Sequence, residues 1–325
     1  MIIKNIKNTF LVGKINNPVG LAFIISILLL IIGQIVSPGF ATLEQIINLL
    51  IVASFLGIVA GGQTLVIMSG NSGIDLSVGN VVTMGAIIGG ALIKEQNENV
   101  LLGLIVVLAI TFIVGLLNGI GSTYFNIPPL IMTLSMGIIV QAISKFITGG
   151  VPVGGAAPIL RNLVIGRFLG IPGILYIWLA FSILIIIILR NSTYGIYLLS
   201  VGANDKAAYL SGVPVRLIRI LTYGFSSMIA GASGFFYLGY LGSVYNITLG
   251  DKYTLPSIIA VVIGGTSLAG GNGGYIGTIA GAIVLQILES ILITINIEQF
   301  GRNIIFGLVL LGLMFSYARG KKLRV

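Results

Sequence analysis

The sequence predicts an all-α, polytopic membrane protein, and three observations support that fold class. Of the 325 residues, 57% are hydrophobic and only 8% are charged, whereas a soluble domain carries about 25% charged residues. The mean hydropathy is +1.13 over the whole chain, so the apolar excess is not confined to one segment. Apolar runs also recur along the sequence, near the length of about 20 residues that a helix needs to cross a bilayer. Lipid is therefore the expected solvent for most of the chain.

We expect about ten membrane-spanning helices in a single transmembrane permeation domain that covers residues 1–325. Each run is expected to be helical because lipid offers no partner to an unpaired backbone N–H or C=O group. The third and eighth runs are short for a complete crossing. The ten runs are Val19–Val36, Ile46–Met68, Val78–Ile93, Val100–Ile120, Leu130–Ile147, Ile171–Leu189, Leu217–Tyr240, Leu255–Leu268, Gly274–Ile293 and Asn303–Tyr317.

The first apolar run follows Lys4, Lys7 and Lys14, a charge pattern that secretory signals share. No clear small-x-small cleavage site follows the run, whereas nine further apolar runs do. We therefore expect the run to be retained as the first span.

Basic residues are distributed unequally between the two expected sides of the membrane. With the N-terminus inside, the inner segments are the N-terminal arm, the loop 190–219 and the C-terminal tail, and they hold 11 of the 17 Lys and Arg residues. This bias predicts an N-in and C-in topology, which requires an even number of spans. Because the basic residues flank spans, the net charge of +9 indicates topology and no nucleic-acid partner.

Glycine accounts for 46 residues and lies largely inside the apolar runs. Pairs such as Gly115 and Gly119 have the spacing of closely packed transmembrane helices. Residues 69–79 and 264–274 are too rich in glycine and polar side chains to form ordinary helix, and irregular backbone at membrane depth must be buried in protein or line a wet cavity. The candidate pathway or packing residues of the second stretch are Gly264, Gly265, Thr266, Gly270 and Gly271.

Several classes of chemistry are excluded by composition. The chain has no His and no Cys, which removes zinc sites, disulfides, thiol nucleophiles and histidine-based triads. It also has no G-x-x-x-x-G-K-[ST] motif, the loop that holds the phosphates of ATP. We therefore expect no catalytic residue, metal or cofactor in this chain, and any ATP that drives it must be bound by another subunit.

Two carboxylates fall in or beside the apolar runs, Asp75 and Glu289. Asp75 precedes the third run, where it is expected either to cap the helix or to act in a gate or solute path. Glu289 lies toward the outer end of the ninth run, where it is expected either to snorkel to the interface or to line the pathway or bond between helices. No Lys or Arg in the spans is expected to pair with them, so the sequence indicates no proton or sodium coupling network.

The inner loop 190–219 is the longest polar stretch expected on that side. Residues 206–212 predict a short helix that ends at Gly212, because glycine adopts the left-handed conformation of a helix C-terminus. Such a helix, parallel to the membrane, is suited to docking into the groove of a partner. The alternative is a surface helix that only connects two spans.

These residues resemble the permeases of ABC importers. Lys206, Ala207, Ala208 and Gly212 resemble the E-A-A-x-x-x-G signature of the helix that couples such permeases to their ATPase, with Lys206 in the place of the glutamate. The segments 73–79, 126–134, 202–213 and 260–271 resemble the ribose-type permeases of simple-sugar importers, in the same order, from about residue 45 to the end.

The resemblance implies a type II ABC importer fold in a bacterial cytoplasmic membrane. It implies that the chain is a permease subunit for a monosaccharide or related sugar, which moves the solute by alternating access. The implied partners are an ABC ATPase, an extracytoplasmic sugar-binding protein and a second permease subunit, identical or paralogous. Two features differ from the family pattern: two additional residues precede Asp75, and Glu289 replaces a polar uncharged residue.

Three alternatives remain at this point. ABC permeases for branched-chain amino acids or for nucleosides share the architecture, but the segments 73–79 and 260–271 favour the sugar branch. A secondary carrier would need no ATPase, and the scarcity of charge within the runs argues against it.

Overall fold

The computed structural model describes residues 18–149, 154–244 and 248–320, with side chains up to residue 315. In this part of the chain the regular structure is helical, apart from two strands of two residues each that pair in an antiparallel hairpin. The elements are α2 (Pro18–Val36), α3 (Leu43–Met68), α4 (Val78–Ile93), the 3₁₀ helix η1 (Asn97–Asn99), α5 (Val100–Thr123), α6 (Pro129–Thr148), α7 (Pro158–Ile165), β1 (Arg167–Phe168), β2 (Ile171–Pro172), α8 (Gly173–Asn191), α9 (Thr193–Ala203), α10 (Asp205–Leu210), α11 (Val215–Leu241), α12 (Asp251–Ile263), α13 (Tyr275–Thr294) and α14 (Gln299–Gly320).

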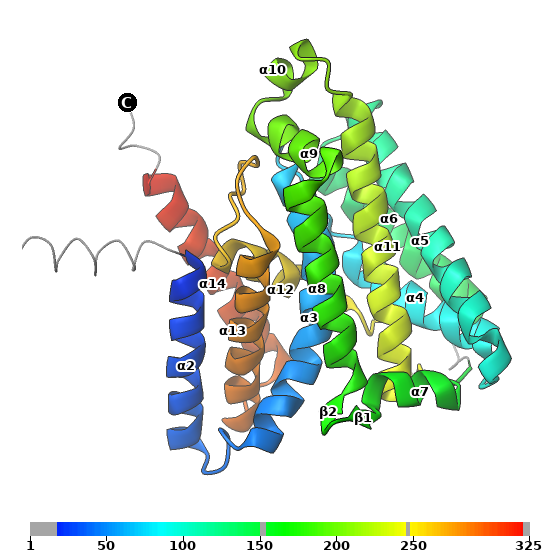
Figure 1. Cartoon of the computed structure of the whole chain (residues 1–325), viewed down its shortest axis with the longest axis vertical. Coiled ribbons are helices and arrows are strands. Elements are labelled where there is room, and N and C mark those ends of the chain that lie inside the picture. Colours follow the sequence, from blue (N-terminus) through cyan, green and yellow to red (C-terminus); the bar gives the residue numbers. More distant parts are fainter. Residues whose placement is uncertain (1–17, 150–153, 245–247, 321–325) are drawn as a thin grey trace, which may run out of the picture.

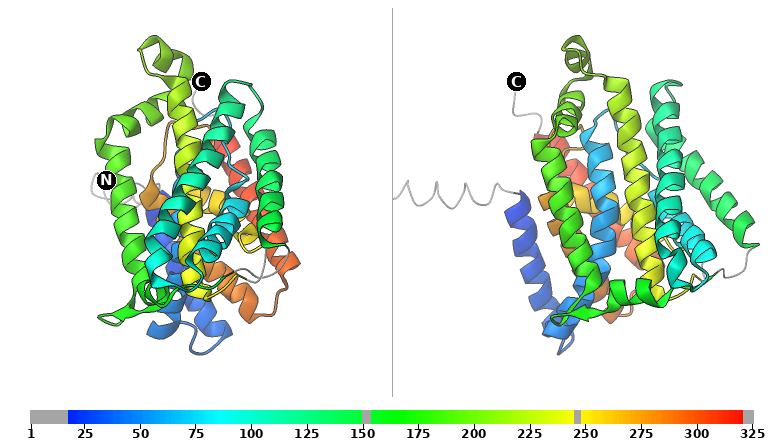
Figure 2. Two further views of the ribbon diagram at one scale, coloured as in Figure 1. Left: turned by 90° about the vertical axis from the view of Figure 1, so that its right-hand side faces the viewer. Right: turned by 45° about the vertical axis from the view of Figure 1, so that its right-hand side comes forward.

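Helix α11 lies at the centre of one half of the molecule, where it packs against α5, α4 and α3, while α13 packs against α12, α3 and α2 in the other half. The short helix α10 projects at one end of the molecule, and α7 with the β1–β2 hairpin covers the opposite end (Figure 1). We call these the α10 end and the α7 end. The views in Figure 2 show the same separation from two further directions.

Glycine permits the close packing of α5 on α11. A Cβ atom at Gly119 would lie 2.6 Å from the Cα atom of Ile220, and one at Gly115 would meet the carbonyl of Tyr223. No side chain fits at either position, so the backbones touch directly, as the spacing of these glycines predicts.

A helix occupies each of the ten apolar runs, namely α2, α3, α4, α5, α6, α8, α11, α12, α13 and α14. Six helical segments of the described chain meet the length and hydropathy of a membrane span by themselves: α2, α3, η1 with α5, α6, α8 and α13. Helices α4 and α12 have only 16 and 13 residues. Helix α11 has 27 residues and is long enough to cross. Many of its residues are Ser, Gly and Tyr that are buried against other helices, so its hydropathy is lower. Ten crossings therefore remain a prediction.

The expected bounds of the eighth run are wrong. Helix α12 covers Asp251–Ile263 and not Leu255–Leu268, because the backbone turns at Gly264 and Gly265, and Gly265 has φ = +87°. The residues from 264 to 274 form an irregular loop instead.

Large apolar side chains cover the outer helices. Exposed examples are Ile35 on α2, Leu101 on α5, Phe146 on α6, Leu179 on α8 and Leu308 on α14. A soluble monomer does not present apolar surface of this extent, so the protein is a multi-pass membrane protein with these faces toward lipid or toward other subunits.

Candidate functional site

Helix α10 covers Asp205–Leu210, so it begins one residue before the predicted segment 206–212, and Gly212 follows its C-cap. Asn204 accepts a hydrogen bond from the N–H of Ala207 (3.0 Å) at its start, the usual capping arrangement. At its end Gly212 adopts φ = +83°, and the N–H of Val213 donates to the carbonyl of Ala208 at 3.0 Å. This is the glycine-dependent ending expected for a short surface helix.

The side chains of α10 divide into a buried anchor and an exposed face. Ala208 is buried against the protein, and Lys206 and Ala207 are exposed. Tyr209 and Leu210 are 72% and 85% exposed, although they lie at the end of the molecule and not on its lipid-facing sides (Figure 1). Exposed apolar residues in that position indicate a surface that another protein covers.

Two polar contacts fix α9 and α10 to the first turns of α11. The Arg219 guanidinium lies 3.3 Å from the Asp205 carboxylate, and the Tyr194 hydroxyl lies 2.9 Å from that of Thr222. Burial raises the pKa of Tyr194 to about 12, so its hydroxyl stays protonated and can hydrogen-bond. These two contacts tie α9 and α10, including the exposed residues Tyr209 and Leu210, to α11.

A groove of about 880 Å³ lies beside α10, between the first turn of α11 and the turn that joins α5 to α6. Tyr124 and Asn126 of that turn line the groove, and the Arg216 guanidinium lies 5.3 Å from the centre of the Tyr124 ring. The adjacent Phe125 is 72% exposed. The α5–α6 turn thus extends the exposed apolar surface of Tyr209 and Leu210.

The two glycine-rich loops meet each other at the last turn of α9. The N–H of Gly271 donates to the carbonyl of Met68 at 3.0 Å, and a Cβ atom at Gly270 would meet the Cα atom of Gly70. A Cβ atom at Gly202, the penultimate residue of α9, would lie 2.5 Å from the backbone nitrogen of Gly271. We call this contact of three backbones the glycine junction; it leaves no room for side chains between α3, α9 and the loop 264–274.

The other candidate residues of the second glycine-rich stretch also lie in packed positions. Gly264 abuts Gly277 of α13, and a Cβ atom at Gly265 would lie 2.5 Å from the Pro18 side chain. Thr266 is fully buried, and its hydroxyl accepts from the N–H of Gly274 at 3.4 Å. These residues pack against neighbouring segments. Their role in the solute pathway stays a prediction.

Asp75 is fully buried and lies three residues before the start of α4. Its Oδ1 atom accepts from the N–H of Ser77 at 2.9 Å and from the Ser77 hydroxyl at 2.5 Å. Ser77 is the residue that precedes the helix, and its own side chain makes no capping bond. Asp75 therefore holds the turn ahead of α4 and does not bond to the free N–H groups inside the helix. The additional residues upstream form a tight turn, in which Asn71 and Ser72 have φ values of 55° and 53°.

Glu289 lines a cavity of about 170 Å³ together with Lys252 of α12 and Asn303 of α14. The positive charges of Lys252 and Arg302 lie close enough to interact with the Glu289 carboxylate. Neither of these basic residues is buried: Lys252 is exposed and Arg302 is partly buried. Lys252 belongs to the first turn of a helix that packs antiparallel to α13, and it also donates to the Tyr237 hydroxyl at 2.7 Å.

Comparisons with known proteins identify the family. Residues 45–316 match the family described as "Branched-chain amino acid transport system / permease component". The chain belongs to this family of ABC importer permeases. It is 32% identical to the ribose import permease of Escherichia coli K12 over 293 residues (89% of this chain, 90% of the relative). It is 30% identical to the ribose import permease of Bacillus subtilis over 287 residues (87% and 88%), and 31% identical to the fructose import permease of Bifidobacterium longum over 260 residues (78% and 71%). No solved structure matches the chain.

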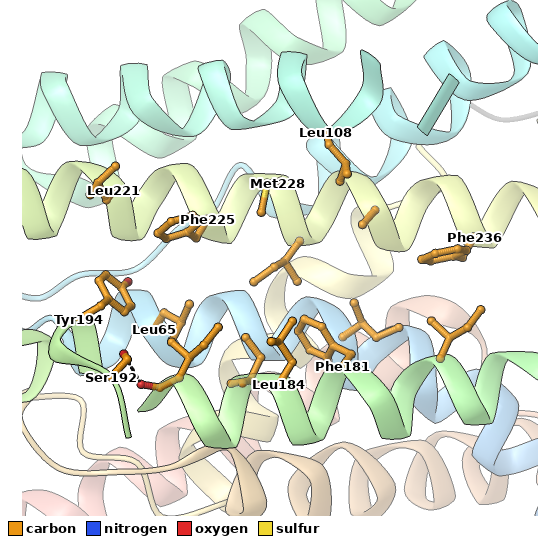
Figure 3. A pocket seen from close by; sticks show the side chains of 16 residues that line it. Leu65, Leu108, Phe181, Leu184, Ser192, Tyr194, Leu221, Phe225, Met228 and Phe236 are labelled. Atoms are coloured by element: carbon orange, nitrogen blue, oxygen red, sulfur yellow. Dashed lines mark hydrogen bonds between the residues drawn. The ribbon is translucent and has the colours of Figure 1, made fainter. Parts of the chain in front are cut away.

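The permease also has an apolar groove of about 560 Å³ between α8 and α11, floored by α3 (Figure 3). Phe181, Leu184, Phe225 and Met228 line it, and Tyr194 closes one end. A sugar would lose its hydrogen bonds to water there without gaining others. This groove is therefore unsuited to the solute, and lipid chains suit it better.

Sequence reasoning missed several residues of the docking surface. No prediction from the sequence covers Tyr124 and Phe125, although two adjacent aromatic residues in a turn, next to Asn126, indicate an exposed contact surface. Tyr209 and Leu210 fell inside the predicted short helix, but only the structure shows that they face outward. The pairing of Asp205 with Arg219 joins residues from two different helices and has no local signature.

Proposed function

We propose that this permease is the transmembrane subunit of an ATP-driven importer for a monosaccharide or a related simple sugar. The sugar class is supported by the relatives, which are named as ribose and fructose import permeases. The single observation that supports ATP-driven coupling most directly is α10, a short capped helix with exposed apolar residues at the end of the molecule.

The proposed partners follow from what the chain contains. It has no phosphate-binding loop, so ATP is bound and hydrolysed by a separate ABC ATPase that docks on α10, the α5–α6 turn and the groove between them. A second permease subunit, identical or paralogous, completes the solute path between the two chains. An extracytoplasmic sugar-binding protein delivers the solute at the α7 end.

The proposed orientation places the α10 end in the bacterial cytoplasm. The beginning of α2 and the end of α14 both lie toward the α10 end (Figure 1), which fits an N-in and C-in chain with an even number of crossings. The basic loop 190–219 then also lies inside, in agreement with the usual charge bias.

Transport proceeds by alternating access. Closure of the two ATPase subunits moves α10, and the ion pair between Asp205 and Arg219 transfers that movement to α11. The glycine junction transfers it to α3 and to the loop 264–274, because backbones in direct contact cannot slide independently. ATP can shift the equilibrium only through contacts that differ between the two states, and we place those contacts on the exposed residues of the segment Lys206 to Gly212.

Co-purification tests this proposal. A tagged permease isolated in mild detergent is expected to retain an ABC ATPase, whose ATP hydrolysis rises when the sugar-loaded binding protein is added. A matched Leu210→Asp variant should be recovered in the same amount without the ATPase. Equal retention of the ATPase by both forms would argue against docking at α10, and an unmodified permease isolated without any ATPase would argue against the ATP-driven importer.

A further inference from the structure

The loop 69–77 folds back between α3 and α4 and buries a carboxylate beyond the reach of solvent. Asp75 has 0% exposed surface. Its Oδ1 atom receives two hydrogen bonds from Ser77, whereas its Oδ2 atom has no hydrogen-bond partner. One oxygen of a buried carboxylate therefore has no hydrogen bond of good geometry.

Further unpaired oxygen atoms surround this carboxylate. Ser226 and Ser227 on α11 lie close enough for their hydroxyls to interact with the carboxylate. Both are fully buried, and neither hydroxyl makes a hydrogen bond of good geometry. Asn118 on α5 donates to the Ser77 hydroxyl at 3.0 Å, and its own Oδ1 atom has no partner. The group thus gathers unpaired oxygens from the loop, α11 and α5.

Tyr223 closes the group on its α10 side. It lies one turn before Ser226 on α11, interacts electrostatically with the Asp75 carboxylate, is buried, and has an unpaired hydroxyl. The nearest basic side chain along this face is Arg219, whose charge is directed to Asp205 in the one ion pair of the described residues. No protein cation is thus hydrogen-bonded to Asp75.

Buried polar groups without partners destabilise a fold unless water or an ion satisfies them. Here the unpaired atoms are oxygens of a carboxylate, hydroxyls and an amide, which are the donors that hard cations prefer. A single carboxylate balances one positive charge, whereas calcium sites use several carboxylates and magnesium retains its own waters. The donor set therefore suits a monovalent cation.

We propose that Asp75, Ser226, Ser227 and Asn118 bind a sodium ion at the centre of the permease. The ion is a fixed structural charge and is not transported, because every one of these residues is fully buried and ATP supplies the energy for import. It joins the loop 69–77 to α5 and α11. That loop follows Met68 of the glycine junction, so an occupied site stabilises the structure on which α10 rests.

Thermal unfolding of the purified full-length permease tests the proposal, with the fluorescence of Trp178, the single tryptophan of the chain, as the signal. Melting is compared in sodium chloride and in choline chloride at equal ionic strength. Sodium is expected to raise the melting temperature by about 2 °C or more, in a saturable manner. Binding of radioactive sodium should reach one ion per chain.

Three variants separate ion binding from general stability. Asp75→Asn keeps the shape of the side chain and should abolish both the sodium shift and sodium binding. Ser226→Ala should raise the sodium concentration for half-maximal effect at least threefold, and it remains informative where Asp75→Asn does not fold. The matched control is Ser54→Ala on α3, which also removes a buried hydroxyl but one bonded to its own helix at Ile51 (2.6 Å); it should keep the full sodium shift. Equal melting of the unmodified permease in sodium and choline, or an unchanged sodium shift in Asp75→Asn, would overturn the proposal.

Discussion

Replacement of Gly212 by valine is expected to weaken docking of the ATPase, and so reduce uptake, without unfolding the permease. Gly212 has φ = +83°, and no atom lies within 4 Å of the position that a Cβ atom would take. The substitution therefore causes no collision, and its cost is that of the left-handed backbone alone, about 1–2 kcal/mol for a residue other than glycine. The chain avoids that cost when residue 212 leaves the left-handed conformation, which breaks the hydrogen bond from Val213 to Ala208 at the end of α10.

The magnitude of the effect on docking follows from this cost. We assume that the ATPase binds α10 only in the conformation with residue 212 left-handed. A cost of 1.4 kcal/mol for adopting that conformation then weakens ATPase binding about tenfold. Uptake should fall by a similar factor, while the amount of permease in the membrane and its melting temperature change little, since α10 is a short surface helix.

The matched control is Gly39→Val. Gly39 has φ = +96° and likewise open space around it, but it lies in the turn between α2 and α3 at the α7 end (Figure 1). The assay is ATP-dependent uptake by membrane vesicles, with the retained ATPase measured by co-purification. Normal uptake and normal ATPase retention by Gly212→Val would refute the reasoning, as would an equal loss in Gly39→Val.

Three further predictions concern single residues. Leu210→Asp should lower ATPase retention at least tenfold in co-purification with no change in melting temperature, because its side chain is 85% exposed; a parallel loss of stability would place Leu210 in the fold instead. Gly271→Ala should lower the melting temperature by several degrees, since its Cβ atom would lie 2.6 Å from the backbone of α9 at φ = +69°; an unchanged melting temperature would show that the glycine junction is loose. Tyr275→Phe should lower the free energy of unfolding by about 1–3 kcal/mol, because it removes the acceptor for Trp178 (3.0 Å) and the donor to Gly57 (2.8 Å); denaturant unfolding that matches the unmodified permease would contradict that account.

The positions of the helices could be predicted because lipid imposes a strong local signal. Runs of apolar residues locate ten of the thirteen α-helices of the described chain, and Gly212 locates the end of α10. The end of α12 was missed because apolar residues continue past Ile263 up to Leu268, while the backbone conformation at Gly264 and Gly265 already breaks the helix.

The site could be predicted only where it depends on local sequence. The glycine junction joins Gly70, Gly202 and Gly270, which lie far apart in the chain and share no periodicity that would bring them together. The proximity of Lys252 to Glu289 depends likewise on the antiparallel packing of α12 and α13. Composition places Lys252 in an outer segment but cannot show what it faces.

Transport in reconstituted vesicles tests the central claim most directly. The permease, its co-purified ATPase and the sugar-loaded binding protein are placed in proteoliposomes, and uptake of the sugar is followed with ATP and with ion gradients varied separately. The account predicts uptake that requires ATP on the α10 side, continues when ion gradients are dissipated, and falls about tenfold in Gly212→Val. Uptake by the permease alone, driven by an ion gradient without ATP, would contradict it.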